Sequence, residues 1–108
     1  MTVAELMENL SLKTFALADD KRIVSGGYTG DLLSWVMGRA QADEAWVTIM
    51  SNSNIVAVAA LTDVACIILS ENVEPDPGVA ESAMARGINL LGSSQSSFAL
   101  SARIQALL

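Results

Sequence analysis

The sequence is short of the residues that most catalytic and metal sites use. It contains no histidine and a single cysteine, Cys66, among 108 residues. Without histidine the chain lacks the commonest general base near neutral pH and the commonest metal ligand. One cysteine forms no disulfide within the chain, and an iron–sulfur cluster usually takes about four thiolates. We therefore expect a cytoplasmic protein that is not an enzyme and holds no metal or other cofactor.

Positive charge is also scarce. Six basic residues stand against 12 acidic ones, giving a net charge of −6, and only Lys21 and Arg22 are adjacent. Because no basic stripe is available to neutralise phosphates, we expect no nucleic-acid partner. The N-terminus lacks the charged flank and apolar core of a signal peptide. The longest uncharged run, residues 45–62, is interrupted by residues 51–54, Ser-Asn-Ser-Asn, so we expect no membrane span.

What the sequence has in excess is apolar side chains. Hydrophobic residues make up 52% of the chain and charged residues 17%. A domain of this size has a high ratio of surface to volume, so part of this apolar surface does not fit inside one copy. The composition predicts an oligomer, most simply a two-fold homodimer.

The apolar pattern alternates between strands and helices along one domain, residues 1–108. Thr2 and Glu5 form a capping-box pattern before the first helix, and Gly87 is placed as the C-terminal stop of a later one. This alternation predicts an α/β fold, a single three-layer domain with a mostly parallel sheet flanked by helices. Strands are expected at 13–17, 22–25, 45–50, 65–69 and 89–91. Helices are expected from 3, at 31–40, from 53 or 54 to 61, at 78–86, and from 94 or 96 to 107.

Small polar residues follow the predicted strands. In an open parallel sheet such residues share the carboxyl edge, where ligands gather and where helix N-termini favour anions. The same residues are also good helix caps, which explains the pattern without any ligand. If the edge does bind a small molecule or nucleotide, the candidate residues are Ser51, Asn52, Asn54, Ser93 and Ser94 together with Gly26, Gly27, Thr29 and Asp31.

The segment from Ser25 to Gly30 is predicted to be a glycine-rich bend. It resembles a phosphate-binding loop, but Asp31 follows the glycines where such a loop places lysine. A carboxylate in the first turn stabilises a helix and repels phosphate, so Asp31 is predicted to be a cap rather than a catalytic group.

Two predicted helices carry almost no polar face. They are either core helices or a self-association surface. Because the domain is small, we favour the second interpretation. The predicted dimer surface comprises Trp35, Met37, Ile55, Val58 and Ala59.

From Arg22 to Ser34, and onward through residues 35–38, 45–49, 54–59, 65–68 and 87–92, the chain resembles the DRTGG domain family, in particular its free-standing members. The signature itself is kept loosely, as residues 20–27, with Ser25 where the family has threonine. The resemblance therefore carries over the glycines and no role for Asp20 or Arg22. The similarity extends over nearly the whole chain.

This resemblance implies a fold like the N-terminal domain of HPr kinase. It also implies an accessory role, beside CBS domains in some pyrophosphatases, in some phosphotransacetylases, or alone near hydrogenase genes. The family has no assigned catalytic residues, and in multidomain relatives the module packs at subunit interfaces. We therefore expect a prokaryotic, non-enzymatic regulatory module that homodimerises and binds a small ligand or a partner enzyme. The alternative is a protein–protein scaffold without ligand, associated with a redox or phosphotransfer system.

Overall fold

The computed structural model describes all residues, 1–108, and contains five strands and five helices. The strands are β1 (Lys13–Ala16), β2 (Gly26–Thr29), β3 (Glu44–Thr48), β4 (Cys66–Leu69) and β5 (Leu90–Gly92). The helices are α1 (Val3–Leu10), α2 (Leu33–Arg39), α3 (Asn54–Thr62), α4 (Val79–Ala85) and α5 (Ser97–Leu107).

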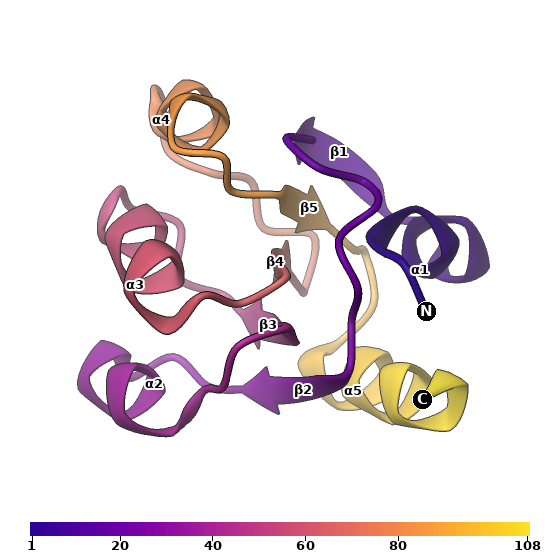
Figure 1. Cartoon of the computed structure of the whole chain (residues 1–108). Helices are drawn as coiled ribbons and strands as arrows, with labels where there is room; N and C mark the ends of the chain where they lie inside the picture. Colours follow the sequence, from indigo (N-terminus) through magenta and orange to yellow (C-terminus); the bar gives the residue numbers. More distant parts are fainter.

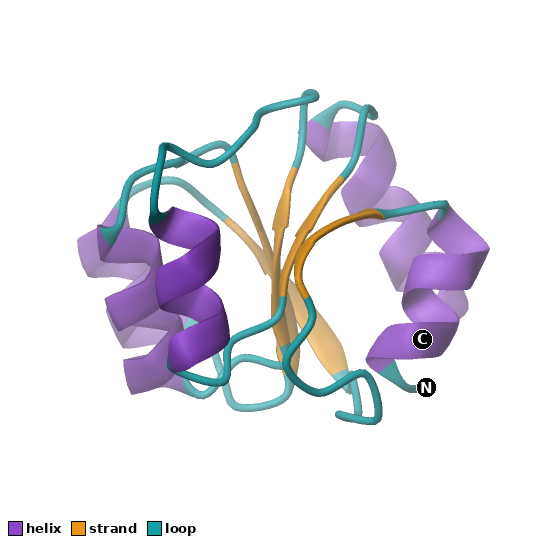
Figure 2. Ribbon diagram, turned by 90° about the horizontal axis from the view of Figure 1, so that it is seen from above, coloured by secondary structure: helices purple, strands orange, loops and turns teal.

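The strands form one mixed sheet in the order β1-β5-β4-β3-β2. Strands β2 to β5 are parallel, and only β1 is antiparallel to its neighbour β5. Helices α2, α3 and α4 cover one face, and α1 and α5 cover the other (Figures 1 and 2). The predicted three-layer α/β fold with a mostly parallel sheet is confirmed.

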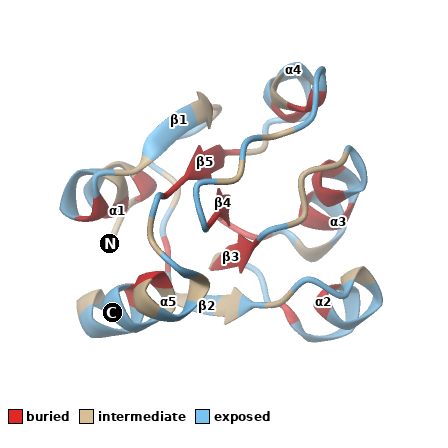
Figure 3. Ribbon diagram, turned by 180° about the vertical axis from the view of Figure 1, so that it is seen from behind, coloured by how far each residue is buried: buried red, intermediate tan, exposed pale blue.

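The core lies on both faces of the three central strands, which are buried along their length (Figure 3). Successive side chains of a strand point to opposite faces, so each central strand supplies two clusters. Trp46, Ile67 and Leu90 pack toward α2, α3 and α4, whereas Val47 and Ile68 pack toward α1 and α5. Burial on both faces explains why β4 and the middle of β3 are apolar without interruption.

Several predicted helix ends are confirmed. The Thr2 hydroxyl accepts a hydrogen bond from Glu5 N at 3.1 Å, and Thr2 N donates to Glu5 Oε1 at 3.0 Å, which completes the capping box. The bonds that Thr2 N and the Thr2 hydroxyl donate to Glu5 Oε1 hold the pKa of Glu5 below its ordinary value. The Ser96 hydroxyl accepts from Ala99 N and caps α5. Gly87, with φ of 72°, ends α4 as predicted.

The glycine-rich segment differs from its prediction. Residues 22–25 contribute only one isolated bridge, from Ile23 to Thr2, and the strand begins instead at Gly26. None of Gly26, Gly27 and Gly30 has a positive φ. The segment is therefore an extended edge strand rather than a bend, because its backbone pairs with β3 from Gly26 onward.

Candidate functional site

The carboxyl edge of the sheet gathers most of the predicted polar residues, but not all. Thr29, Asp31, Ser51 and Ser93 follow or end parallel strands and lie at this edge. Gly26 and Gly27 lie at the opposite end of β2, where Gly26 pairs with Glu44, the first residue of β3. These two glycines are therefore too far along the strand to share one ligand with Ser51 or Ser93.

Asp31 closes the end of β3. Its Oδ1 accepts hydrogen bonds from the buried Thr48 hydroxyl at 2.8 Å and from Ile49 N at 2.9 Å. The N-cap of α2 is Leu32, which makes no side-chain cap bond. The prediction that Asp31 caps this helix is wrong, since its carboxylate instead binds groups that β3 leaves unpaired.

The loop after β3 uses its polar groups internally. The Ser51 hydroxyl donates to Asp76 Oδ1 at 2.9 Å, and Asn52 Oδ1 accepts from Asn54 N at 2.9 Å. Ser53 stands at the N-cap of α3 without a side-chain cap bond. Asn52 therefore satisfies the start of α3, rather than the predicted Ser53 or Asn54.

The loops after β4 and β5 are joined in the same way. The Ser93 hydroxyl accepts from Gln95 N at 3.1 Å, and the Ser70 and Ser97 hydroxyls lie 2.6 Å apart. Glu71 Oε2 accepts from Ser97 N at 2.9 Å at the start of α5. Ser94 is exposed. These contacts show that helix starts and loop closure use most of the predicted ligand residues.

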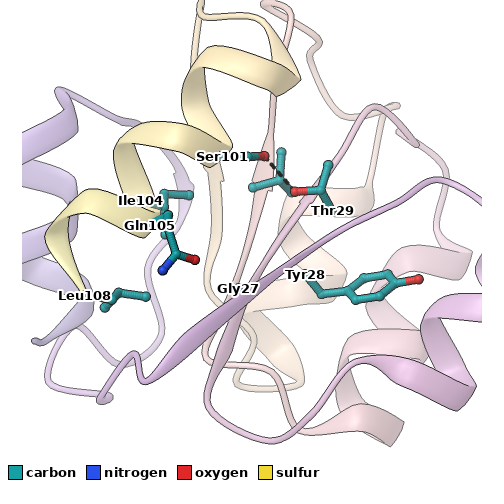
Figure 4. Close-up of a pocket in the computed structure, with 8 residues that line it drawn as sticks. Gly27, Tyr28, Thr29, Ser101, Ile104, Gln105 and Leu108 are labelled. Atoms are coloured by element: carbon teal, nitrogen blue, oxygen red, sulfur yellow. Dashed lines mark hydrogen bonds between the residues drawn. The ribbon is translucent and has the colours of Figure 1, made fainter.

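The surface is hollowed beside β2 rather than along this polar edge. A cavity of about 190 Å³ lies between β2 and α5, and a more open one of about 440 Å³ adjoins it. Both include Thr29 and Ser101, whose hydroxyls are 2.6 Å apart (Figure 4). We call this the β2–α5 groove. Its lining residues are Gly27, Tyr28, Thr29, Val47, Ser97, Phe98, Ser101, Ala102, Ile104, Gln105 and Leu108.

The chemistry of the groove is uncharged. None of its lining side chains is acidic or basic. Ser101 and Gln105 follow one another at helical spacing on the side of α5 that faces β2, and Phe98, 86% exposed, stands at the rim. Hydroxyl and amide groups beside an aromatic ring suit a neutral ligand with a flat ring. Sequence reasoning found Gly27 and Thr29 here but missed Phe98, Ser101 and Gln105.

The other end of the sheet is held by Arg22. Its guanidinium donates to Asp43 Oδ1 at 3.0 Å and to Asp63 Oδ1 at 3.0 Å, and also to the Asp63 carbonyl oxygen at 2.6 Å. Partial burial works to lower the pKa of Arg22, but the bonds to the two carboxylates outweigh it and keep that pKa raised. Arg22 thus ties together two turns that precede β3 and β4.

The five residues predicted for a dimer surface separate into two groups. Trp35, 53% exposed, and Met37 stand on the outside of α2, where Arg39 stacks over the Trp35 ring at 4.0 Å. Ile55, Val58 and Ala59 are buried in the core. We reassign these three from the dimer surface to the core, because α3 packs them against the sheet between α2 and α4.

Two further features bear on function. Cys66 lies in the middle of the sheet, and burial raises the pKa of its thiol to about 12, which leaves it inert. No helix of the structure combines the length and the hydrophobicity needed to cross a bilayer.

Comparison with known proteins defines the class of the fold. No protein-family model and no curated protein matches the sequence. The α/β fold of the chain is nevertheless DRTGG-like, as the resemblance implied. It is similar to the crystal structure of the CBS and DRTGG domains of the regulatory region of Clostridium perfringens pyrophosphatase, complexed with its activator diadenosine tetraphosphate.

The similarity to that structure has a TM-score of 0.76 at 14% sequence identity. It covers 94% of this chain and 44% of the other, so this chain spans less than half of the length of the protein it matches. At this identity the likeness establishes the fold.

Proposed function

We propose that the chain is a non-enzymatic, cytoplasmic regulatory module that works as a homodimer and binds a small neutral ligand with a flat ring in the β2–α5 groove. Two adjoining cavities share Thr29 and Ser101, and no charged side chain lines either of them. This observation carries the ligand proposal. The similar structure is a regulatory region bound to its activator, which supports the same kind of role.

The groove favours a nucleoside over its phosphates. Phe98 offers a ring face, and Gln105 offers an amide that both donates and accepts. A polyphosphate needs arginine, lysine or a free helix N-terminus for compensation. No basic side chain lines the groove, and the start of α5 in it already binds the Glu71 carboxylate through Ser97 N. Adenosine is therefore the first probe, and ATP and diadenosine tetraphosphate are the comparison.

The test is a thermal-shift titration with these three compounds. A ligand at about 100 times its Kd stabilises the folded chain by about 2.7 kcal/mol, which gives a clear rise in Tm. We expect adenosine to raise the Tm and Gln105→Ala to remove the rise. Ser94→Ala is the matched control, because Ser94 is exposed among the predicted residues of the carboxyl edge. A rise that Ser94→Ala removes and Gln105→Ala keeps contradicts the groove and favours the carboxyl edge.

A scaffold without ligand is the second candidate, and the exposed aromatic side chains favour it. Trp35 and Phe98 stand on the surface where a partner enzyme is able to cover them. If no nucleoside, nucleotide or metabolite shifts the Tm, while a partner enzyme binds the wild-type chain and not Trp35→Ala, the scaffold replaces the ligand-binding module.

A further inference from the structure

The sheet ends in two edge strands, and only β1 is protected. β1 carries Lys13, whose Nζ donates to Asn72 Oδ1 at 2.7 Å, and its register with β5 is broken between Thr14 and Ala16. A lysine and an irregular register are the devices that keep an edge from pairing with another strand.

The edge strand β2 has neither device. Its sequence is Gly-Gly-Tyr-Thr, without charge or proline, and it pairs with β3 in an unbroken register on its inner side. No strand lies on its outer side, where the ribbon is open to solvent (Figure 1). An edge of this kind offers unpaired backbone groups to an incoming strand.

The two helices beside β2 extend this open side with apolar groups. They lie on opposite faces of the sheet at its β2 end (Figure 1). α2 exposes Trp35 and Met37, and α5 exposes Phe98. The side of the molecule around β2 therefore combines a free strand edge with exposed apolar side chains on both faces.

We propose that a second copy of this chain docks on this side through antiparallel pairing of β2 with β2. The pairing has a two-fold axis perpendicular to the sheet, so that α5 packs beside α5 and α2 beside α2. This inference rests on the proposed function, because it names the surface of the homodimer.

Charge and symmetry favour a second copy as the occupant. Two copies of the same strand edge that pair around a two-fold axis have complementary hydrogen-bonding groups. Each strand donates N–H groups to the other and accepts from it through its carbonyls. The chain carries a net charge of −6, so most of its surface repels an identical copy. β2 carries no charged side chain and avoids that repulsion.

The size of the molecule points the same way. Its Cα extents are 30 × 25 × 24 Å, and a stable dimer needs about 800 Å² from each partner. One whole side of a body of these dimensions offers roughly 600 to 700 Å² in projection, which side chains enlarge. The seven residues of α2 alone offer too little area for a stable dimer interface. β2 together with α2 and α5 covers one whole side of the molecule.

Site-specific crosslinking tests the geometry. A Cβ at Gly27 meets only Ala45 O at 3.5 Å and Ile104 Cγ2 at 3.8 Å, which are ordinary contacts, so Gly27→Cys is tolerated. The native Cys66 is buried and does not compete. We expect a short bismaleimide to convert Gly27→Cys into a covalent dimer and to leave the control Met84→Cys, exposed on α4, as single chains.

A charge variant tests the energetics. Phe98→Lys puts a charge in place of an exposed apolar side chain at the Thr29 end of this surface, and we expect it to raise the dimer Kd at least tenfold in sedimentation equilibrium, whereas Met84→Lys leaves the Kd unchanged. A dimer that keeps its Kd in Phe98→Lys and is not crosslinked through Gly27→Cys overturns this surface while the homodimer stands. A wild-type chain that sediments as a monomer overturns both the surface and the homodimer.

Discussion

The two edges of the sheet are built in opposite ways. β1 is fixed to the body of the protein by side chains: Asn89 binds the loop that follows it, and Phe15 packs over Gly92 of β5. β2 is fixed by its backbone pairing with β3, by the bond between Thr29 and Ser101 and, directly after the strand, by the Trp46 indole N–H, which donates to Gly30 O at 2.9 Å. Only β1 also carries a lysine and an irregular register, so we propose β2 as the edge that is available for a partner.

The strongest test of this comparison is Asn89→Ala. Asn89 is 3% exposed; its Oδ1 accepts from Ala18 N and Asp19 N, and its Nδ2 donates to the carbonyls of Asp19 and Ala65. Removing it leaves four backbone groups without these partners, among them the buried Ala65 carbonyl, and we expect a loss of about 3 kcal/mol of unfolding free energy. Urea denaturation measures it.

The matched control for that variant is Asn9→Ala. The exposed Asn9 makes one hydrogen bond, to Glu5 O within α1, and its removal costs about 0.5 kcal/mol or less. Equal losses at the two positions would show that Asn89 does not hold the β1 edge.

A methyl group at Gly92, which pairs with β1, or at Gly27 of β2 gives the next largest effect. A Cβ at Gly92 falls 2.5 Å from Phe15 Cε2, so Gly92→Ala forces the ring to move and costs about 1 to 3 kcal/mol. Gly27→Ala meets no such obstacle and stabilises the chain by about 0.4 to 1 kcal/mol by restricting the unfolded state. Thermal melts of both variants check the difference.

The contrast at the glycines has an internal check. Phe15→Leu removes the ring that opposes the new methyl group, so it relieves part of the cost of Gly92→Ala in a double-mutant cycle. If the stability losses of Phe15→Leu and Gly92→Ala simply add in the double variant, the cost of Gly92→Ala does not arise from the contact with Phe15.

The fold was predictable where one physical signal dominates. Residues 45–47 and 66–69 are apolar without interruption because both faces of β3 and β4 are covered. The Thr2 capping box and the Gly87 stop depend on residues close in sequence. Local signals of this kind need no knowledge of the rest of the chain.

The candidate site was predictable only in part. Glycine permits a bend, but whether it bends depends on β3, which pairs with Gly26–Thr29 and holds the segment extended. The uncharged α3 fits either a core or an interface, and only its place between α2 and α4 decides for the core. Ser101 contacts Thr29, which lies 72 residues away in the sequence. No spacing of residues within α5 predicts this contact.

The smallest expected effect comes from the bond that holds α5 to the open edge. Ser101→Ala removes the 2.6 Å contact with Thr29, and because the pair is exposed we expect a loss of about 0.5 to 1 kcal/mol. Its consequence is local, since this is the only side-chain hydrogen bond between α5 and β2. Amide hydrogen exchange should therefore accelerate in β2 and stay unchanged in β1, where no contact has been altered. Faster exchange in both strands would mean that the two edges are coupled through the sheet. It would contradict the view that β1 and β2 are held independently of each other.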